Sequence, residues 1–212
     1  KTIRKPYLIS KANFVACHNF SFLEKYDMLK NLMEGGIFLL TSAHPASEVW
    51  KHIPAKVQKQ IVEKKIRFYV IDAVKIAEEV GLGGRINAIM QTAFFKISKV
   101  IDDSIAIDAI KKAIKKTYGS KGDKVVEMNM KAVDMTVANI EEVKVPASFT
   151  GKVKDVTVVP ASAPDFVKNT TSKILKGEGD TVKVSEMPED GTWPTGTTQY
   201  EKRSIAIDIP SW

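Results

Sequence analysis

The first seventy residues alternate between continuous apolar runs and stretches in which apolar residues recur at helical spacing. The runs at 12–18, 37–41 and 67–72 have the length of strands and lack an alternating polar face, which indicates strands that are buried on both sides. Between them, apolar residues at 21–33 and 57–62 recur every three or four positions and predict helices. Strands separated by such helices imply right-handed parallel crossovers. We therefore expect an α/β fold, with a doubly wound, mainly parallel sheet that carries helices on both faces.

The first predicted helix has clear end signals. Ser21 is a plausible N-cap, and Glu24 stands three residues later as its capping-box partner. Gly35 and Gly36 then follow the last residues with helical spacing, and glycine is the usual residue beyond a helix end. We expect the helix to run from Ser21 to Met33.

After Asp72 the hydrophobic pattern becomes wholly helical. Glycine-rich turns at 81–84 and 119–122 separate neighbouring helices. The predicted helices cover 74–80, 87–100, 105–118 and about 125–140.

The texture of the chain changes near Ala147. From Gly151 onward the sequence is rich in threonine, proline and glycine, with one predicted helix at 165–175. Short β-like pieces are expected at 182–184 and 204–209. The prediction is two domains, 1–147 and 148–212, of which the second is a small irregular α+β segment that needs a neighbour to pack against.

Charge and composition narrow the possible partners and locations. The 212 residues include 32 Lys and Arg against 25 Asp and Glu, a net charge of +7, which favours acidic partners by long-range attraction. A single cysteine excludes an internal disulfide and cannot by itself form a zinc or iron-sulfur site. No apolar run approaches the roughly 18 residues of a membrane span. We expect a cytoplasmic protein without a membrane association.

Both ends of the sequence suggest a piece of a longer chain. The first residue is Lys1, without an initiator methionine, a signal core or transit-peptide character. At the other end, Ile205, Ile207 and Ile209 would share one face of a strand that needs neighbours, and the chain stops at Trp212. We expect the parent protein to continue beyond this residue.

The segment GLGGRIN, at 81–87, is the most suggestive local motif for ligand binding. Its glycines lead into a helix whose free N–H groups could meet a phosphate, with Arg85 as a charged clamp. The spacing matches neither a P-loop nor a dinucleotide fingerprint. A plain turn between two helices is the competing interpretation.

The residue types of common catalytic sites are scattered along the chain. His18, His44 and His52 lie on different predicted elements, so a triad or metal cluster would need a convergence that the pattern does not indicate. Cys17 precedes His18 at a strand end, where adjacent residues point to opposite faces. We predict no catalytic residue in this chain.

Two charged clusters have simple structural interpretations. Lys111, Lys112, Lys115 and Lys116 form a stripe opposite apolar positions, as in any solvated amphipathic helix, with docking of an acidic protein as the alternative. Nucleic-acid binding is favoured less than docking of a protein, because no aromatic platform or known motif accompanies the charge. For the run Tyr200–Arg203 we favour anchoring of a loop through salt bridges over chemistry.

Longer motifs resemble one enzyme family. The segment DGTWPTGTTQYEKRSIAIDIPSW is similar to the one that names the EKR domain of pyruvate:ferredoxin (flavodoxin) oxidoreductases, with Tyr200–Arg203 as its signature. The preceding gamma-type domain of the same enzymes is resembled by three segments, which are ANFVACHNFSFLEKYDML, RFYVIDAVKIAEEVGLGGRINAIMQTAFFKIS and VVEMNMKAVD. Together the matches cover nearly the whole chain in the family's order.

The resemblance implies a role in the oxidative decarboxylation of pyruvate. Coenzyme A takes the acetyl group, and two electrons pass through iron-sulfur clusters to ferredoxin or flavodoxin. The gamma-type domain is associated with coenzyme A, and the matching positions are Arg85 and Asn129, with Asn87 and Lys131 as weaker candidates. A guanidinium can fork two phosphate oxygens, whereas an asparagine could read an adenine edge or a ribose hydroxyl.

The resemblance also implies what lies outside this chain. The thiamine diphosphate, Mg and iron-sulfur sites belong to other domains of a parent enzyme that is expected to be a homodimer. A glycine-rich strand, loop and helix should precede the IRKPYL stretch, and four-cysteine ferredoxin-like motifs should follow Trp212. Two alternatives remain open: a purely structural connector between domains, and a basic nucleic-acid-binding domain.

Overall fold

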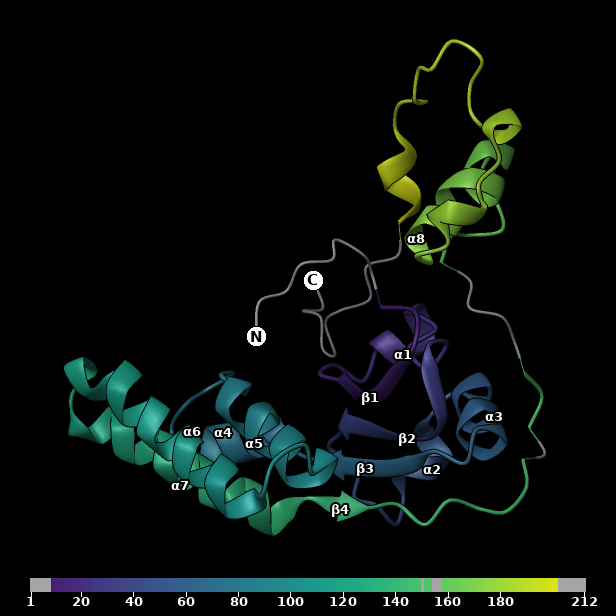
Figure 1. Ribbon diagram of the computed structural model, residues 1–212. Coiled ribbons are helices and arrows are strands. Elements are labelled where there is room, and N and C mark those ends of the chain that lie inside the picture. Colours follow the sequence, from purple (N-terminus) through teal and green to yellow (C-terminus); the bar gives the residue numbers. More distant parts are fainter. Residues whose placement is uncertain (1–8, 150, 154–157, 202–212) are drawn as a thin grey trace, which may run out of the picture.

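The structure is a computed structural model that describes residues 9–149, 151–153 and 158–201. Two regions are distinguished in it (Figure 1). The sheet region, residues 9–149, contains all the described strands and the longest helices. The EKR region, residues 158–201, consists of short helical pieces joined by turns. The predicted domain boundary near Ala147 stays a prediction.

The sheet has the strand order β1-β2-β3-β4 in the part of the chain that is described. The first three strands are parallel, and β4 pairs antiparallel with β3. The predicted parallel strands are thus confirmed, whereas β4, with only two residues, was not predicted. The strands are β1 (Ala12–Cys17), β2 (Leu32–Thr41), β3 (Arg67–Ile71) and β4 (Glu141–Glu142).

Helices cover both faces of this sheet, because consecutive residues of the strands are apolar and point to opposite sides. On one face, Phe38 and Phe68 pack against α1 (Phe22–Lys25), α2 (Val49–His52) and α3 (Ala55–Glu63). On the other face, Leu39 and Ile71 pack against a second set of helices. These are α4 (Ala73–Glu79), α5 (Asn87–Ser98) and α7 (Asp123–Asn139).

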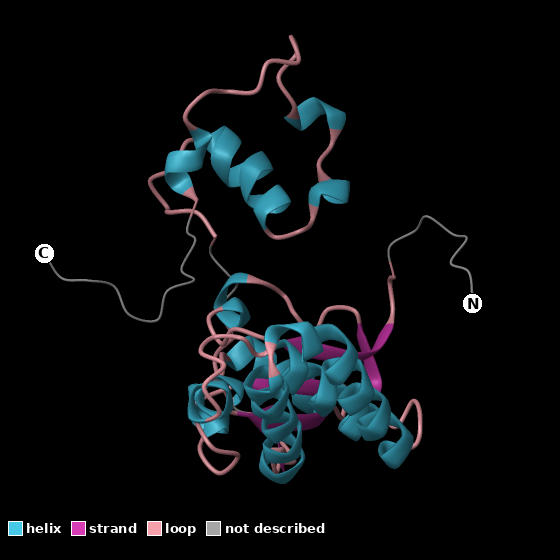
Figure 2. Cartoon of the chain, turned by 90° about the vertical axis from the view of Figure 1, so that its left-hand side faces the viewer, coloured by secondary structure: helices cyan, strands magenta, loops and turns pink. Residues whose placement is uncertain are grey.

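The long helices between β3 and β4 begin and end within two residues of their predicted bounds. Figure 2 shows this helical layer in front of the strands, which are magenta. The remaining long helix, α6 (Asp103–Tyr118), packs on α5 and α7, and the one-turn helix η1 (Gly119–Lys121) joins α6 to α7. The α/β class, with a mainly parallel sheet and helices on both faces, is confirmed.

The predicted helix from Ser21 to Met33 is wrong beyond its first turn. Helix α1 ends at Lys25, and β2 already begins at Leu32. The Lys64 ammonium donates hydrogen bonds to the carbonyls of Leu29, Lys30 and Leu32 at 2.6, 3.0 and 2.9 Å. A distant side chain therefore bonds all three carbonyls, and that of Leu29 also accepts a local backbone N–H, from Leu32 at 3.2 Å. No local sequence pattern reveals the Lys64 contact.

The predicted end signals of that helix also have other roles. The amide and hydroxyl of Ser21 both donate to Asn19 Oδ1, at 3.0 and 2.8 Å, and Ser21 makes no capping bond itself. Gly35 and Gly36 lie inside β2, not after a helix. Gly35 has φ +70°, a left-handed conformation that glycine adopts without strain. The capping box and the glycine stop are both corrected.

The EKR region is helical where a helix was predicted and forms no strand at 182–184, where one was predicted. The stretch predicted as a helix contains the π-helical turn η2 (Val167–Thr171) and α8 (Ser172–Leu175). Val182 to Val184 do not form a strand, since η4 (Val184–Glu186) begins there and the Glu186 carboxylate accepts the Lys183 N–H at 2.8 Å. The predicted strand at 204–209 lies outside the described residues. The other turns are η3 (Gly179–Thr181) and η5 (Thr197–Tyr200).

No helix within the described ranges is both long enough and apolar enough to cross a bilayer.

Candidate functional site

The carboxyl ends of the three parallel strands meet at one edge of the sheet. The loops after Cys17, Thr41 and Ile71 line a cavity of about 310 Å³ and a neighbouring hollow of about 540 Å³. In open α/β sheets this edge is the usual position of ligands. We name these two spaces together the strand-end cavity. The smaller space is also lined by Met135, Asn139 and Glu141.

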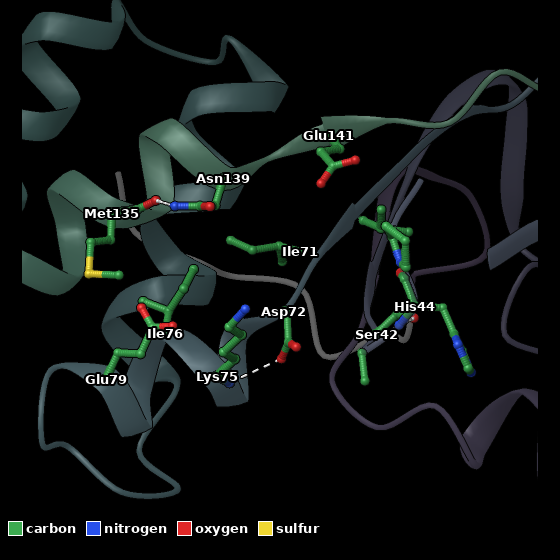
Figure 3. Close-up of a pocket in the computed structure, with 13 residues that line it drawn as sticks. Ser42, His44, Ile71, Asp72, Lys75, Ile76, Glu79, Met135, Asn139 and Glu141 are labelled. Carbon is green, nitrogen blue, oxygen red and sulfur yellow. Dashed lines mark hydrogen bonds between the residues drawn. The ribbon is translucent and has the colours of Figure 1, made fainter. Parts of the chain in front are cut away.

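Hydrogen bonds hold the loops around the strand-end cavity, and Figure 3 shows the one from Lys75 to Asp72 as a dashed line. The buried Ser42 donates its N–H to the Ile71 carbonyl at 3.1 Å, and its hydroxyl accepts the His44 N–H at 2.9 Å. Asp72 caps α4, because its Oδ1 accepts the Lys75 N–H at 3.0 Å. From α4 and β4, Glu79 and Glu141 complete the wall. The loops at this edge of the sheet are thus fixed by hydrogen bonds.

The charges of the strand-end cavity decide what it can hold. Asp72, Glu79 and Glu141 contribute carboxylates to the smaller space, and among the described residues that line it Lys75 is the one lysine or arginine. Such a wall repels phosphate and suits groups that donate hydrogen bonds. Sequence reasoning missed this site. The sequence feature that could have indicated the site is that Ser42 and Asp72 directly follow predicted strands.

The histidines are arranged differently from any metal site. The rings of His44 and His52 stack face to face, with centroids 3.7 Å apart and planes 2° apart, and Phe20 lies edge-on to His44. Ring nitrogen lone pairs lie in the ring plane, so stacked rings cannot converge on one ion. His18 lines the larger space of the strand-end cavity. No group of three metal-ligating side chains occurs among the described residues.

Cys17 is a core residue. Its side chain is 0% exposed and belongs to the apolar cluster around Phe38. Burial raises the pKa of the thiol to about 11, and the thiol donates a hydrogen bond to the Asn19 carbonyl at 3.0 Å. Because the thiolate is the reactive form, this cysteine is not poised as a nucleophile near neutral pH.

The GLGGRIN segment forms an open turn at the start of α5. The residue before the helix, Ile86, makes no side-chain capping bond in the described part of the chain, so N–H groups of the first helical turn stay available. Arg85 is exposed two residues before α5 begins. No carboxylate in the described ranges forms an ion pair with it. Asn87, the first residue of α5, is also exposed. The geometry keeps both the phosphate-binding interpretation and the plain-turn interpretation open.

The second predicted motif, VVEMNMKAVD, lies directly beside this turn. A Cβ added to Gly81 would meet Met128 Cε on α7 at 3.0 Å. Lys131 is exposed one turn farther along α7. Asn129 is only 5% exposed and donates its amide to the Val125 carbonyl at 2.8 Å. The fold therefore brings the two motifs together, with three of the four predicted side chains open to solvent.

The signature at the end of the EKR region is only partly described. Tyr200 packs against a small apolar core that includes Val158 and Val167. Glu201 is half-buried, and its N–H donates to the Thr198 carbonyl at 3.1 Å. The predicted anchoring by Lys202 and Arg203 concerns residues outside the described ones.

The sequence matches two families of known proteins. Residues 1–138 match the family described as pyruvate ferredoxin/flavodoxin oxidoreductase. Residues 152–206 match EKR, described as a domain of unknown function. The two matches agree with the resemblance seen in the motifs.

Curated relatives match along nearly the whole chain. A pyruvate-flavodoxin oxidoreductase of Rhodospirillum rubrum is 48% identical over 212 residues, which is 100% of this chain and 18% of the relative. A pyruvate:ferredoxin oxidoreductase of Moorella thermoacetica is 48% identical over 210 residues, which is 99% of this chain and 18% of the relative. The chain thus spans 18% of the length of these relatives.

Among solved structures, the chain is similar to the PORC subunit of a pyruvate oxidoreductase from Thermotoga maritima. The TM-score is 0.51 at 19% identity, covering 64% of this chain and 67% of the subunit, which is a likeness of fold. The family match over residues 1–138 carries the assignment. This chain belongs to the pyruvate ferredoxin/flavodoxin oxidoreductase family.

Proposed function

We propose that the chain is the coenzyme A-contacting part of a pyruvate:ferredoxin or pyruvate:flavodoxin oxidoreductase. The parent reaction converts pyruvate and coenzyme A to acetyl-CoA, CO2, one proton and two electrons, and the electrons reduce ferredoxin or flavodoxin. In this proposal the chain supplies binding contacts and an interdomain scaffold, and no acid, base or nucleophile. Thiamine diphosphate, Mg and the iron-sulfur clusters belong to other parts of the parent enzyme, which we take to be a homodimer.

The main support for the proposed coenzyme A contact is that Arg85 is exposed beside the uncapped start of α5. A helix N-terminus presents N–H groups and a partial positive charge to an anion. A guanidinium without a carboxylate partner can add two parallel hydrogen bonds to one phosphate. Together they form a site for the phosphates of coenzyme A.

The remaining predicted residues contribute to different degrees. Asn87 and Lys131 are exposed near the same turn and can supply a further donor and a positive charge. Asn129 is the weakest of the four, because its amide is bonded to its own helix and little of it is open to a ligand. Arg85 is therefore the residue on which the test rests.

The strand-end cavity suits the uncharged part of the same ligand. Its carboxylates disfavour phosphate but can accept hydrogen bonds from the amides of the pantetheine arm. Met135 of the cavity wall lies seven residues along α7 from Met128, beside the GLGGRIN turn, which is a rise of about 10 Å. An extended ligand with phosphates at Arg85 is long enough to approach the cavity.

The test is calorimetric titration of the full chain with coenzyme A and, in parallel, with pantetheine, which lacks the phosphates. Arg85→Ala should weaken coenzyme A binding about ten- to a hundredfold, the loss expected for a charged hydrogen-bonding group. Arg85→Lys should fall between, because it keeps the charge and loses the fork. Pantetheine binding should not change in either variant.

Two outcomes would contradict the proposal. Equal coenzyme A affinity of the wild type and Arg85→Ala would remove Arg85 from the site. Absence of any binding heat in the wild type would favour the second candidate function, a structural connector between the other domains of the parent enzyme. The small core of the EKR region is the observation that favours this second candidate, because a segment that buries so little apolar area is expected to pack on a neighbour.

A further inference from the structure

A strongly basic surface lies on the helical hairpin formed by α6, η1 and α7. Between residues 111 and 131 the chain has seven lysines and two acidic residues. Figure 1 shows α6 and α7 extending side by side beyond the end of the sheet. We name Lys111, Lys112, Lys115, Lys116 and Lys121 the lysine face.

Most of the lysine face carries uncompensated charge. Lys111 is 2.6 Å from Asp134 on α7, and the Lys121 ammonium lies 5.5 Å from the centre of the Tyr118 ring. Within the described ranges, the other three lysines form no ion pair, and they are exposed. The charge is thus presented to solvent rather than used inside the fold.

The helix dipole accounts for only part of this arrangement. Lys115 and Lys116 lie in the last turn of α6, where positive charge stabilises the helix end. Lys111 and Lys112 lie about two turns before the end, where this effect has faded. A cluster that extends over about two turns at the end of a projecting hairpin is more than capping requires.

From these observations we propose that the lysine face docks the acidic surface of the protein electron carrier. This inference rests on the proposed function, which requires such a carrier. Complementary charge between two proteins raises the rate of encounter and fixes the orientation. The groove beside the face, about 430 Å³, is lined by Asp108, Met130 and three of the lysines, so it offers apolar stems as well as charge.

The surface favours a protein over other anionic partners. Binding of single-stranded nucleic acid uses aromatic side chains as stacking platforms, and Tyr118, the aromatic residue beside the face, is half-buried with Lys121 over its ring. Membrane binding needs apolar side chains that insert next to the charges. The large exposed apolar residues Val100, Ile101 and Ile105 lie before or at the start of α6, away from the lysines of its last two turns.

The experiment compares two charge-reversed chains with the same net charge. The first carries Lys112→Glu, Lys115→Glu and Lys116→Glu, and the control carries the same change at the exposed Lys51, Lys144 and Lys152. Oxidised ferredoxin and oxidised flavodoxin, the carriers named in the relatives, are the probes, in biolayer interferometry at low and at high salt. Duplex DNA and anionic vesicles serve as further probes.

We expect at least about a tenfold loss of carrier affinity in the lysine-face variant and a much smaller loss in the control. Wild-type binding should also weaken as salt rises. Equal losses in the two variants would overturn the proposal, as would the absence of carrier binding or tighter binding of DNA or vesicles. Coenzyme A titration of the same variants separates this inference from the proposed function, because it should be unchanged.

Discussion

The sheet region and the EKR region are stabilised in different ways. In the sheet region, both faces of β2 are covered, and Phe38 stacks on Phe68 with centroids 5.3 Å apart in one of two large buried clusters. The EKR region buries a core of small residues, which are Val158, Val159, Ala163 and Val167, with Leu175 and Tyr200 at its border.

In the EKR region, where the apolar core is small, polar contacts hold neighbouring segments together. Glu186 accepts hydrogen bonds from the Lys173 ammonium at 2.7 and 2.9 Å and from the Lys183 N–H at 2.8 Å. Its carbonyl also accepts the Thr170 hydroxyl at 3.0 Å. A short segment cannot bury enough apolar area to offset its conformational entropy. The EKR region should therefore open more readily than the sheet region, and four tests address this difference.

The largest effect is expected from Phe38→Ala. The side chain is fully buried, and its removal should lower the free energy of unfolding of the sheet region by about 3–5 kcal/mol through lost burial and a cavity. Urea denaturation followed by circular dichroism measures the change. As a control, Ile174→Ala in the EKR region alters a side chain that is 45% exposed, and it should change little. A loss below about 1 kcal/mol for Phe38→Ala would show that the cluster is looser than its burial indicates.

Lys64→Met should have the second-largest effect. The substitution keeps an unbranched stem but removes the ammonium that holds the carbonyls of Leu29, Lys30 and Leu32. We expect a loss of about 2 kcal/mol in the free energy of unfolding, since these are charge-assisted hydrogen bonds. Lys65→Met is the matched control, because that ammonium pairs with Glu34 on the surface. Similar losses in the two variants would argue against the role assigned to Lys64.

Glu186→Gln should loosen only the EKR region. Hydrogen bonds from the Lys173 side chain and the Lys183 backbone hold the pKa of Glu186 below its usual value. The carboxylate therefore stabilises the fold above the ordinary glutamate pKa, and this contribution is lost as pH falls through the folded-state pKa. Hydrogen exchange at 167–187 should accelerate in the variant and lose its acid dependence. Glu189→Gln, at an exposed position, should leave exchange unchanged, and equal acceleration throughout the sheet would contradict the assignment.

The smallest perturbation changes no residue and uses Cys17 as a probe of the sheet region. Its raised pKa, about 11 against the ordinary 9.0, means that burial stabilises the fold below pH 9 and that this contribution is lost as pH rises toward 11. Iodoacetamide at pH 8 should label the thiol very slowly in the native chain and in Glu186→Gln, and faster in Phe38→Ala. Rapid labelling of the native chain would contradict the buried position. Labelling in denaturant supplies the reference rate.

Hydrophobic patterns were sufficient for the elements that are long or buried on both faces. The strands beginning at Ala12 and Arg67 and the helices after Asp72 are found close to their predicted bounds. Each has a period that is repeated over enough residues to distinguish a strand from a helix. The candidate Arg85 came from the GLGGRIN motif and Asn129 from resemblance, and the approach of the two motifs through Gly81 and Met128 was not visible in the pattern.

The sequence by itself determined the α/β class, the parallel strands and the family, because apolar periodicity and long motifs are local properties of the chain. Tertiary structure decided the end of α1, the two-residue β4 and the strand-end cavity. Each of these depends on contacts between distant residues, such as Lys64 with Leu29, or β4 with β3. Hydrogen-bond partners that are far apart along the chain leave no periodic signal, so only the folded structure reveals them.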